Sequence, residues 1–438
     1  MMTDPLNGRL PESRRVFLRS LFDAAVGATH PEQTLPAALP APPANGRILL
    51  LSTGKAGGSM MAAAVRHYRE TLGLAESRLF GLGTARHGYE GHNPLIPVLG
   101  AGHPMPDAAS LAASQRTLAL AAQAQPEDIA VAMISGGGSA NWIAPAGAIS
   151  LEEKQALTKA LLHSGANISA INCVRKHLSR IKGGRLAGQI GAKHLWTLAI
   201  SDVPGDDPSS IASGPTVPDP TTQAEALAIL ERYKVSLPDT ARRVLNDPGE
   251  ETLKADDPVF QRSSFQIITR PRDGLAAAIK AAEAAGYHVI SLGPDVEGEA
   301  CEVATRHAAM ALELKASGKR AVILSGGELT VTMRGDGTGG PNQEYALALA
   351  LALQGAPGIA ALAGDTDGTD GGRGAPTDPA GAYLDETTLA RARARGLDAQ
   401  AHLANNNSTP FFRHLDDLLE TGPTLTNAND LRAIVVES

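Results

Sequence analysis

Four apolar runs of this chain each end in a loop whose residues could hold a phosphorylated ligand. The segments are AVAMISGGGSAN (130–141), LAISDVPGDDPSSIASGP (198–215), AVILSGGELT (321–330) and IAALAGDTDGTDGG (359–372). Short apolar runs that end at such loops predict buried parallel strands, whose carboxyl ends line the ligand crevice of an open α/β sheet. Because the loops combine backbone N–H donors with carboxylates, they suit a phosphate group carried with a divalent metal.

The first of these loops is a candidate binding site for a phosphate or a substrate carboxylate. Glycine permits positive φ and a close approach of the ligand, so successive backbone N–H groups can face an anion. The alternative is an ordinary tight turn after a buried strand. The candidate residues are Ser135, Gly136, Gly137, Gly138, Ser139 and Asn141.

Three cations are candidates for contacting an anionic group. Lys55 follows the predicted strand 48–53 and precedes a helix, whose N-terminus would add partial positive charge. Lys182 and Arg185 lie in a basic corner at a predicted helix break, with Arg175, Lys176 and His177 on the preceding turn. Arg185 could hold a carboxylate or phosphate with two parallel hydrogen bonds. We expect Lys55 and Arg185 to be catalytic and Lys182 to bind a ligand, with a solvated basic surface as the alternative.

Two groups of aspartates also follow predicted strands. Asp202, Asp206 and Asp207 come after the strand 195–200, whereas Asp365, Asp367 and Asp370 come after the strand 358–363. Carboxylates so close together repel each other, which is tolerable in water or around a cation such as Mg²⁺. We therefore expect Asp202 in catalysis, Asp206, Asp207 and Asp365 as metal ligands and Asp367 in ligand binding, with capped and solvated turns as the alternative.

The segment GTGGPNQE (337–344) predicts a helix N-terminus that faces an anion. Asn342 and Gln343 open the expected helix 342–354, and Glu328 lies in the turn after Ser325. We expect Glu328, Asn342 and Gln343 to contact the ligand. Capping of the helix explains Asn342 nearly as well.

Several standard signatures are excluded by their spacing. STGKAGGS (52–59) lacks the upstream glycine and the following Ser/Thr of a Walker A loop, and GLGTARHG (81–88) has its third glycine misplaced for a dinucleotide fingerprint. GGSAN (137–141) lacks the final glycine of a nucleophile elbow. DTDGTD (365–370) has an aspartate where a calcium loop needs its turn glycine. The sequence therefore argues against a P-loop kinase, a simple Rossmann dehydrogenase and an α/β hydrolase.

Alternation of strands and helices predicts an α/β fold with a doubly wound parallel sheet and a second, smaller α/β domain. The 438 residues exceed what one hydrophobic core usually supports, so we expect two domains. We place their boundary near residue 250, in the polar stretch 246–257, which gives domains 1–250 and 251–438. The expected strands are 48–53, 77–82, 96–100, 129–134 and 195–200 in the first series, then 265–269, 287–293, 320–324, 328–333, 358–363 and 431–437. The expected helices are 12–28, 56–72, 107–124, 151–163, 168–190, 223–233, 239–245, 273–285, 299–316 and 342–354.

Composition narrows the class of protein. A net charge of −7, no sustained Lys/Arg block and 3% aromatic residues argue against a nucleic-acid partner. Cys173 and Cys301 are far apart and outside any C-x-x-C, so they support neither a disulfide framework nor a structural zinc site. No apolar stretch approaches the ~20 residues that span a bilayer, and the N-terminus lacks the apolar core of an export signal. We expect a cytoplasmic protein without a membrane partner.

Nine segments, in order over nearly the whole chain, form a series that is far more specific than any one member. They are GKAGGSM (54–60), AGHPMPD (101–107), ISGGGSAN (134–141), VRKHLSRIKGGRLA (174–187), SDVPGDDPSSIASGPT (201–216), SGGELTVT (325–332), GGPNQEYAL (339–347), AGDTDGTDG (363–371) and TGPTLTNAND (421–430). The series resembles the glycerate 2-kinases of the MOFRL group, also called type II glycerate kinases and often labelled hydroxypyruvate reductases of the TtuD type.

The resemblance implies an N-terminal Rossmann-like domain, a smaller C-terminal MOFRL domain and an active site in the cleft between them. It implies transfer of the γ-phosphoryl group of ATP to the 2-hydroxyl of D-glycerate with Mg²⁺, giving 2-phosphoglycerate, with Lys55 stabilising the transferred group. A homodimer is a possible assembly. Two residues depart from the family pattern: Pro341 stands where many relatives have arginine, for which Arg175, Arg185 or Arg334 would substitute, and Leu425 stands where glycine is more usual.

Two other functions stay open. An NAD(P)H-dependent hydroxypyruvate reductase is suggested by the family label and disfavoured by the missing G-x-G-x-x-G. A catalytically silent regulator that binds a small molecule is disfavoured by the lack of any DNA-binding module.

Overall fold

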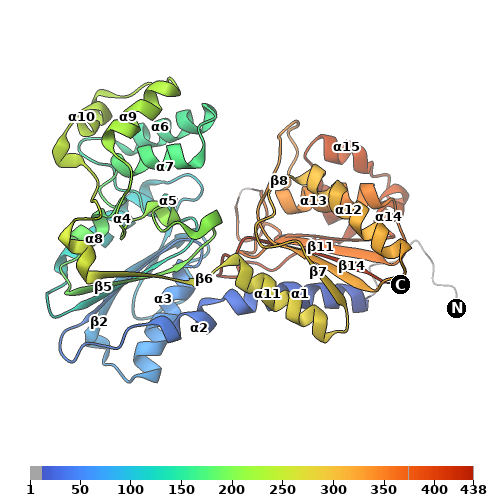
Figure 1. Ribbon diagram of the computed structural model, residues 1–438, viewed down its shortest axis with the longest axis horizontal. Helices are drawn as coiled ribbons and strands as arrows, with labels where there is room; N and C mark the ends of the chain where they lie inside the picture. Colours follow the sequence, from blue (N-terminus) through green and yellow to red (C-terminus); the bar gives the residue numbers. More distant parts are fainter. Residues whose placement is uncertain (1–11, 373, 438) are drawn as a thin grey trace. The chain divides into compact units, whose positions relative to one another are not determined.

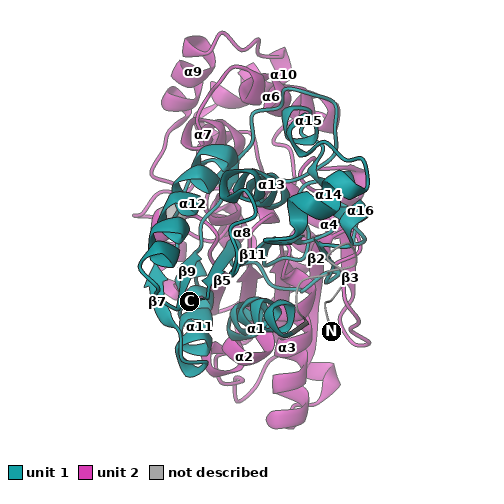
Figure 2. Cartoon of the chain, turned by 90° about the vertical axis from the view of Figure 1, so that its right-hand side faces the viewer, with its two compact units in different colours: residues 1–30, 270–438 teal, residues 31–269 magenta. Residues whose placement is uncertain are grey.

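A computed structural model describes residues 12–372 and 374–437, which form two compact units. One unit comprises residues 31–269, and the other combines the chain before residue 31 with the chain from residue 270 onward (Figure 2). The first eleven residues, on which the expectation of an unexported chain partly rests, lie outside the described residues. No described helix has the length and apolar character needed to cross a membrane.

The unit 31–269 is built on a six-stranded sheet in which every neighbouring pair is parallel (Figure 1). Its order, β3-β2-β1-β4-β5-β6, is that of the doubly wound Rossmann fold, and the order reverses between β1 and β4. The predicted fold class is confirmed. Ligands of such sheets bind beyond the carboxyl ends of the strands at this reversal. The strands are β1 (Ile48–Thr53), β2 (Leu79–Arg86), β3 (Val98–Ala101), β4 (Ile129–Ile134), β5 (His194–Ile200) and β6 (Ser263–Thr269).

The structure divides the chain at residues 269 and 270 rather than near residue 250. The strand expected to open the second series is β6, and it completes the first sheet by pairing with β5 from Leu195↔Ser263 to Ile200↔Thr269. The polar stretch 246–257 is not a linker, because its Glu251 and Lys254 side chains bond to residues of the same unit. The predicted first helix also belongs with the C-terminal residues, as α1 (Glu12–Thr29).

Helices of this unit cover the sheet and form a separate small cluster. Figure 1 shows α6, α7, α9 and α10 gathered together, and they share a core that includes Leu161, Val174 and Leu230. The predicted helix 168–190 is interrupted, because Gly183 and Gly184 have φ of +58° and +79° and turn the chain between α7 and α8. The helices are α2 (Pro31–Thr34), α3 (Gly57–Arg66), α4 (Ala108–Gln123), α5 (Gly138–Asn141), α6 (Leu151–His163), α7 (Ile168–His177), α8 (Arg185–Gln189), α9 (Gln223–Arg232) and α10 (Asp239–Leu245).

The second unit has a mixed six-stranded sheet of order β13-β12-β11-β14-β9-β7. Within this sheet of the described chain, only β7 and β9 pair in parallel, so the expectation of buried parallel neighbours for strands 320–324 and 358–363 holds only in part. Antiparallel β14 lies between β9 and β11, which the apolar pattern could not reveal because it reports burial and not direction. The strands are β7 (His288–Ser291), β9 (Ala321–Ser325), β11 (Ile359–Asp365), β12 (Gly381–Asp385), β13 (Leu418–Leu419) and β14 (Asp430–Val436); β8 (Gly298–Glu299) and β10 (Leu329–Thr330) form a two-stranded ladder.

Two helical layers bury this second sheet. Alternate residues of a strand point to opposite faces, and Val322 and Leu324 of β9 pack with α1 and α11, whereas Ile323 packs with α12 and α13. The large buried surface explains why the first helix joins this unit. The helices after α1 are α11 (Pro271–Ala284), α12 (Ala300–Ala316), α13 (Pro341–Leu353), α14 (Thr388–Ala394), α15 (Ala399–Ala404) and α16 (Ser408–Leu415).

Candidate functional site

The loops after β1 and β4 are bonded to each other at the reversal of the parallel sheet. Lys55 N donates to Gly136 O at 2.8 Å, and Ala56 N donates to Ser135 Oγ at 3.0 Å. Ser135 is fully buried and its hydroxyl also donates to Thr53 O at 3.2 Å, so it ties the two loops together. The predicted glycine loop is therefore an ordered turn, and its hydrogen bonds fix the position of the Lys55 backbone at the end of β1.

Gly137 brings two side chains to one place. Its φ is +82°, and a Cβ atom there would lie 3.0 Å from His103 Cδ2 and 3.4 Å from Lys55 Cγ. The N–H of Gly138 donates to Ser135 O at 3.2 Å, which places that donor inside the turn. Buried Asn141 donates from Nδ2 to Gly102 O at 3.2 Å and so holds the His103 loop against α5. Among the predicted loop residues, Gly137 and Ser139 line an open space beside the turn.

That open space is a cavity of about 280 Å³ with three cations in its wall. Lys154 comes from α6, Arg175 from α7 and Lys182 from the segment after α7. Lys182 Nζ donates to Ser139 O at 2.7 Å, and Lys154 Nζ donates to Arg175 O at 3.0 Å and to Leu178 O at 2.7 Å. The remaining wall consists of His103, Pro104, Met105, Pro106, Gly137, Ser139, Ala140, Ile143, Thr158 and Leu162.

The three cations carry charge that nothing nearby in the unit balances. Lys154 and Lys182 are 2% and 1% exposed, and Arg175 is half-buried. Within residues 12–372 and 374–437, no carboxylate forms an ion pair or a hydrogen bond with any of the three side chains. Burial, followed by the charge of Arg175, lowers the pKa of Lys182 to about 7. Burial also holds the pKa of Lys154 well below its usual value and lowers that of Arg175.

Uncompensated buried charge is unfavourable unless it meets a counter-charge. The cations of α6 and α7 line the same cavity as the glycine turn after β4, and that turn lies where a sheet of this order binds its ligand. The arrangement is therefore suited to hold a small anion. The sequence predicted Lys182 and Ser139 as site residues, and it placed Arg175 in the basic corner and as a substitute for a missing arginine. It gave no sign of Lys154, which sits in an ordinary amphipathic pattern.

Arg185, expected to be catalytic, does not line this cavity. Its guanidinium donates to the carbonyl oxygens of Ser179 and Glu250 and lies 3.9 Å from the Glu250 carboxylate. It faces a different cavity of about 880 Å³, together with Arg180 and Arg262. The turn at Gly183 and Gly184 redirects the chain. Lys182 and Arg185 are only three residues apart, but their side chains therefore line different cavities.

The aspartates after β5 do not form a preassembled metal site. Asp207 accepts hydrogen bonds from Ser209 N at 3.0 Å, Ser209 Oγ at 2.8 Å and Ser210 Oγ at 2.7 Å, so it caps its own turn. Burial opposes ionisation of Asp207, but the bonds from Ser210 and Ser209 outweigh it and lower the pKa. Among the described residues, no group of three His, Cys, Asp or Glu side chains is arranged to hold a metal ion. The expected ligands Asp206 and Asp365 belong to different units.

In the second unit, the start of α13 does face an anion, and that anion is a carboxylate of the chain itself. Asp370 accepts from Asn342 N at 3.0 Å and from Gln343 N at 2.8 Å. Asn342 Nδ2 also bridges Asp370 at 3.2 Å and Asp430 at 2.8 Å, and Arg432 pairs with Asp430 at 2.9 Å. Burial raises the pKa of Asp370 to about 6 and also raises that of Asp430. Asn342 and Gln343 are thus held by carboxylates of their own unit, and their contact with a ligand stays a prediction. The sequence motifs gave no separate role to Asp430 or Arg432.

The other predicted residues of this unit lie at the same sheet edge. Asp365 accepts from Asp367 N at 2.9 Å, and Asp367 accepts from Thr369 N at 2.7 Å, as in short capped turns. Glu328 follows β9 and is exposed. Because Arg432 pairs with Ser325 and Asp430 with Asp365, the start of β14 lies between the ends of β9 and β11. The structure thus brings these residues together at the ends of β9 and β11.

The two departures from the family pattern are explained locally. Pro341 is the first residue of α13, a position where the missing N–H and fixed φ of proline are tolerated. Leu425 has φ of +61°, a left-handed conformation that glycine adopts without strain. The left-handed backbone at this position therefore explains why glycine is more usual there than leucine.

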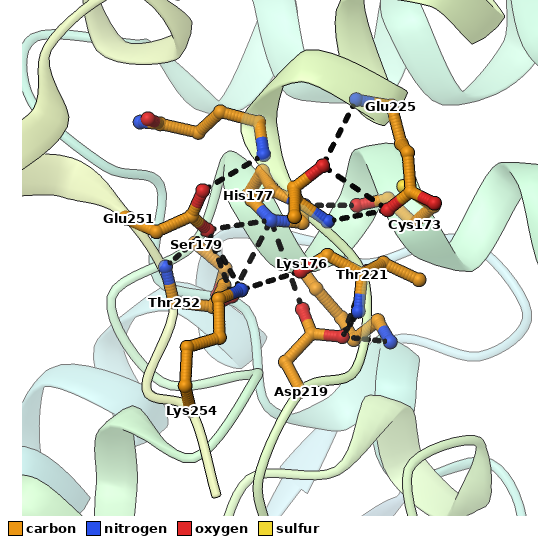
Figure 3. Close-up of polar contacts among 12 residues, drawn as sticks. Cys173, Lys176, His177, Ser179, Asp219, Thr221, Glu225, Glu251, Thr252 and Lys254 are labelled. Atoms are coloured by element: carbon orange, nitrogen blue, oxygen red, sulfur yellow. Dashed lines mark hydrogen bonds and ion pairs between the residues drawn. The ribbon is translucent and has the colours of Figure 1, made fainter. Parts of the chain in front are cut away.

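A buried polar network sets the position of α7 (Figure 3). Lys176 and Asp219, both almost fully buried, form an ion pair of 2.5 Å. His177 Nε2 lies 2.9 Å from Glu251 Oε1, and His177 Nδ1 lies 2.8 Å from Cys173 O. These bonds join α7 to the segments before α9 and after α10. Because Arg175 is the neighbour of Lys176, the network also fixes the helical turn that carries Arg175 into the cavity.

Comparison with known proteins shows which sequence families and which solved structures this two-unit α/β chain is similar to. The MOFRL family matches residues 321–430, and the family described as Domain of unknown function (DUF4147) matches residues 17–246. The chain is 35% identical to the D-glycerate 2-kinase of Thermotoga maritima over 96% of its own length and 98% of that protein. A crystal structure of glycerate kinase from Thermotoga maritima superposes with a TM-score of 0.83, at 35% identity, over 97% of this chain and 100% of that one.

The chain therefore belongs to the glycerate 2-kinase family with a MOFRL domain, as the resemblance of its motifs indicated. A protein of Agrobacterium vitis whose name proposes a hydroxypyruvate reductase is 44% identical over 97% of this chain and 95% of its own length. Both labels named in the sequence analysis thus occur among the relatives. The expected cleft location of the active site stays a prediction.

Proposed function

We propose that this protein transfers the γ-phosphoryl group of ATP to the 2-hydroxyl of D-glycerate in a Mg²⁺-dependent reaction. Similarity over nearly the whole length to a protein named D-glycerate 2-kinase carries the proposal. The cationic cavity at the reversal of the parallel sheet supports it, because the acid substrate and its phosphorylated product are both anions. We also propose that the enzyme is cytoplasmic; the homodimer stays a prediction.

The reaction forms a bond between the 2-hydroxyl oxygen and the γ-phosphorus and breaks the bond to the oxygen that bridges the β- and γ-phosphorus atoms. ADP leaves, and the hydroxyl proton passes to a base or to solvent. Such transfers need positioning and positive charge more than covalent chemistry. Lys55 suits this role, because its side chain lies beside Gly137 at the end of β1. We assign Lys55 to stabilise the transferred group.

The residues present are compatible with Mg²⁺. Magnesium is commonly held by one or two carboxylates together with substrate phosphates, so a preformed group of three is not required. Asp202 and Asp206 in the loop after β5 are the carboxylates that we propose for it, since Asp207 caps its own turn. When bound, the metal would neutralise phosphate oxygens during transfer.

A coupled assay tests the proposal. We expect ADP release that requires D-glycerate and Mg²⁺, and we expect phosphorus NMR of the product to identify 2-phosphoglycerate. The names of the Agrobacterium vitis relatives favour a second candidate, an NAD(P)H-dependent hydroxypyruvate reductase. Oxidation of NAD(P)H with hydroxypyruvate and without ATP, combined with no ADP release from D-glycerate, would replace the kinase assignment by that one.

A further inference from the structure

The cavity beside the Gly137 turn has features that the kinase assignment does not by itself specify. Three cations from three successive segments, Lys154, Arg175 and Lys182, converge on it, and no carboxylate of the described chain is bonded to them. Lys154 Nζ already donates to two backbone carbonyls and Lys182 Nζ to one. The Arg175 guanidinium, in contrast, has no hydrogen-bond acceptor among the described residues. Its five donors are therefore available to a ligand.

We infer that this cavity binds the carboxylate of the acid substrate, with Arg175 as its principal anchor, and that it does so without the nucleotide. The choice of carboxylate over phosphate rests on the proposed function. A planar guanidinium matches a carboxylate with two parallel hydrogen bonds. All of the wall residues lie in the unit 31–269, so the acid-binding part of the site is complete within one folded unit.

Size supports a small acid. The cavity of about 280 Å³ is below the range of about 300–1,000 Å³ that is typical of pockets for drug-sized ligands. An adenine nucleotide exceeds that size, whereas a three-carbon acid does not. Buried Ile143 lies in the wall of the cavity and lowers the local polarity around the pair between ligand and arginine, which strengthens the pair.

The charge balance favours a single negative charge. Burial lowers the pKa of Lys182 to about 7 and holds that of Lys154 well below its usual value, so at neutral pH the cavity carries fewer than three positive charges. Arg175 keeps its charge, because arginine does not deprotonate in proteins. A monovalent carboxylate matches this state better than a phosphate chain does.

Isothermal titration calorimetry of the full chain with D-glycerate, in the absence of nucleotide and Mg²⁺, tests the inference. We expect one site in the wild type and a loss of about 10- to 100-fold in affinity in Arg175→Gln, since a charge-assisted contact disappears. Arg180→Gln is the matched control, because Arg180 is exposed and lines other cavities. Absence of acid binding without nucleotide, or equal binding by Arg175→Gln, would overturn the inference.

Kinetics separate an anchoring role from a structural one. In Arg175→Gln we expect the KM for D-glycerate to rise by a similar factor while the KM for ATP stays within about twofold of the wild type. Arg175→Lys keeps the charge but loses the fork, so it should restore part of the affinity. If Arg175→Gln or Arg175→Lys has a Tm far below that of the wild type, the affinity and KM of the other variant are used for the test. A rise in the KM for ATP alone, or displacement of the ligand by inorganic phosphate but not by short carboxylic acids, would assign the cavity to phosphate instead.

The inference and the kinase proposal can fail separately. If D-glycerate binds in a way that depends on Arg175 but no ADP is released, the kinase proposal fails and the anion site remains. If ADP is released normally and Arg175→Gln leaves the KM for D-glycerate unchanged, the kinase proposal remains and the inference fails.

Discussion

Replacing Lys182 with methionine is expected to make the protein more stable while it weakens binding of the acid. Lys182 is 1% exposed, and its cavity is also lined by Lys154, Arg175 and His103 but by no carboxylate of the residues that the structure describes. A buried charge kept for a ligand raises the free energy of the empty folded state. Methionine has a similar length and no charge, so the substitution removes the unfavourable charge without opening a large void.

The size of the effect follows from the pKa of Lys182. Its fall from 10.5 to about 7 corresponds to a destabilisation of at most about 5 kcal/mol when the lysine is charged in both the folded and the unfolded state. This penalty is complete below pH 7. Above pH 7 the folded protein sheds the proton and the unfolded chain keeps it, so the penalty declines and is lost near pH 10.5. At pH 9 about 2 kcal/mol of it remains.

The loss of the bond from Lys182 Nζ to Ser139 O offsets about 1 kcal/mol of the gain. We therefore expect the Tm of Lys182→Met to exceed that of the wild type by roughly 5 °C or more at pH 6 and by clearly less at pH 9. Differential scanning calorimetry at constant ionic strength, without ligands, measures both values.

Lys159→Met is the control, because Lys159 is an exposed residue of the same helix as Lys154. Its difference from the wild type should be small and independent of pH. A Lys182→Met protein that melts below the wild type at pH 6, or whose gain is equal at pH 6 and pH 9, would refute the reasoning.

Three further predictions concern other parts of the molecule. Leu425→Gly should raise the free energy of unfolding by about 0.5–1 kcal/mol in urea titrations, because φ of +61° is strained for leucine; a decrease would contradict this explanation. Asp370→Ala should lower stability by about 2–3 kcal/mol in the same titrations, since two N–H groups at the start of α13 lose their acceptor, and an unchanged midpoint would show that they find another. Lys55→Ala should reduce kcat for ADP release by about 100-fold or more with little change in the KM for D-glycerate, and full turnover would remove Lys55 from the mechanism.

The local sequence was sufficient for much of the first unit. ILLLST and IAVAMI consist mainly of apolar residues and are buried at all six positions, as strands covered on both faces must be. The glycines after β4 indicated a tight turn at a ligand crevice, and the structure has that turn, with Gly137 in the left-handed region. These features depend on neighbours in the chain, so periodicity and residue type reveal them. The family likewise followed from motifs that occur in order along the whole chain.

Strand order and direction could not be read in the same way. β6 has alternating exposure and follows a polar stretch, and the first strand of a new domain can have the same pattern. Only the pairing of β6 with β5 assigns it to the first sheet. The C-terminal strand was expected from its apolar run, but its insertion between β9 and β11 depends on hydrogen bonds between segments far apart in the sequence. Aspartates that suggested a ligand site, such as Asp370, turned out to cap an element of their own unit.

The cationic cavity shows most clearly what each level of structure decides. The sequence by itself determined that basic residues cluster after position 174 and that a glycine turn follows β4. Only the tertiary structure decided that Arg175 and Lys182 face the cavity while Arg185 bonds to backbone carbonyls elsewhere, because the left-handed glycines between α7 and α8 redirect the chain. Lys154 joined them from a helix whose pattern marks it as an ordinary surface lysine. Its burial depends on the packing of α6 against α7, and such long-range packing is what an amphipathic pattern leaves undetermined.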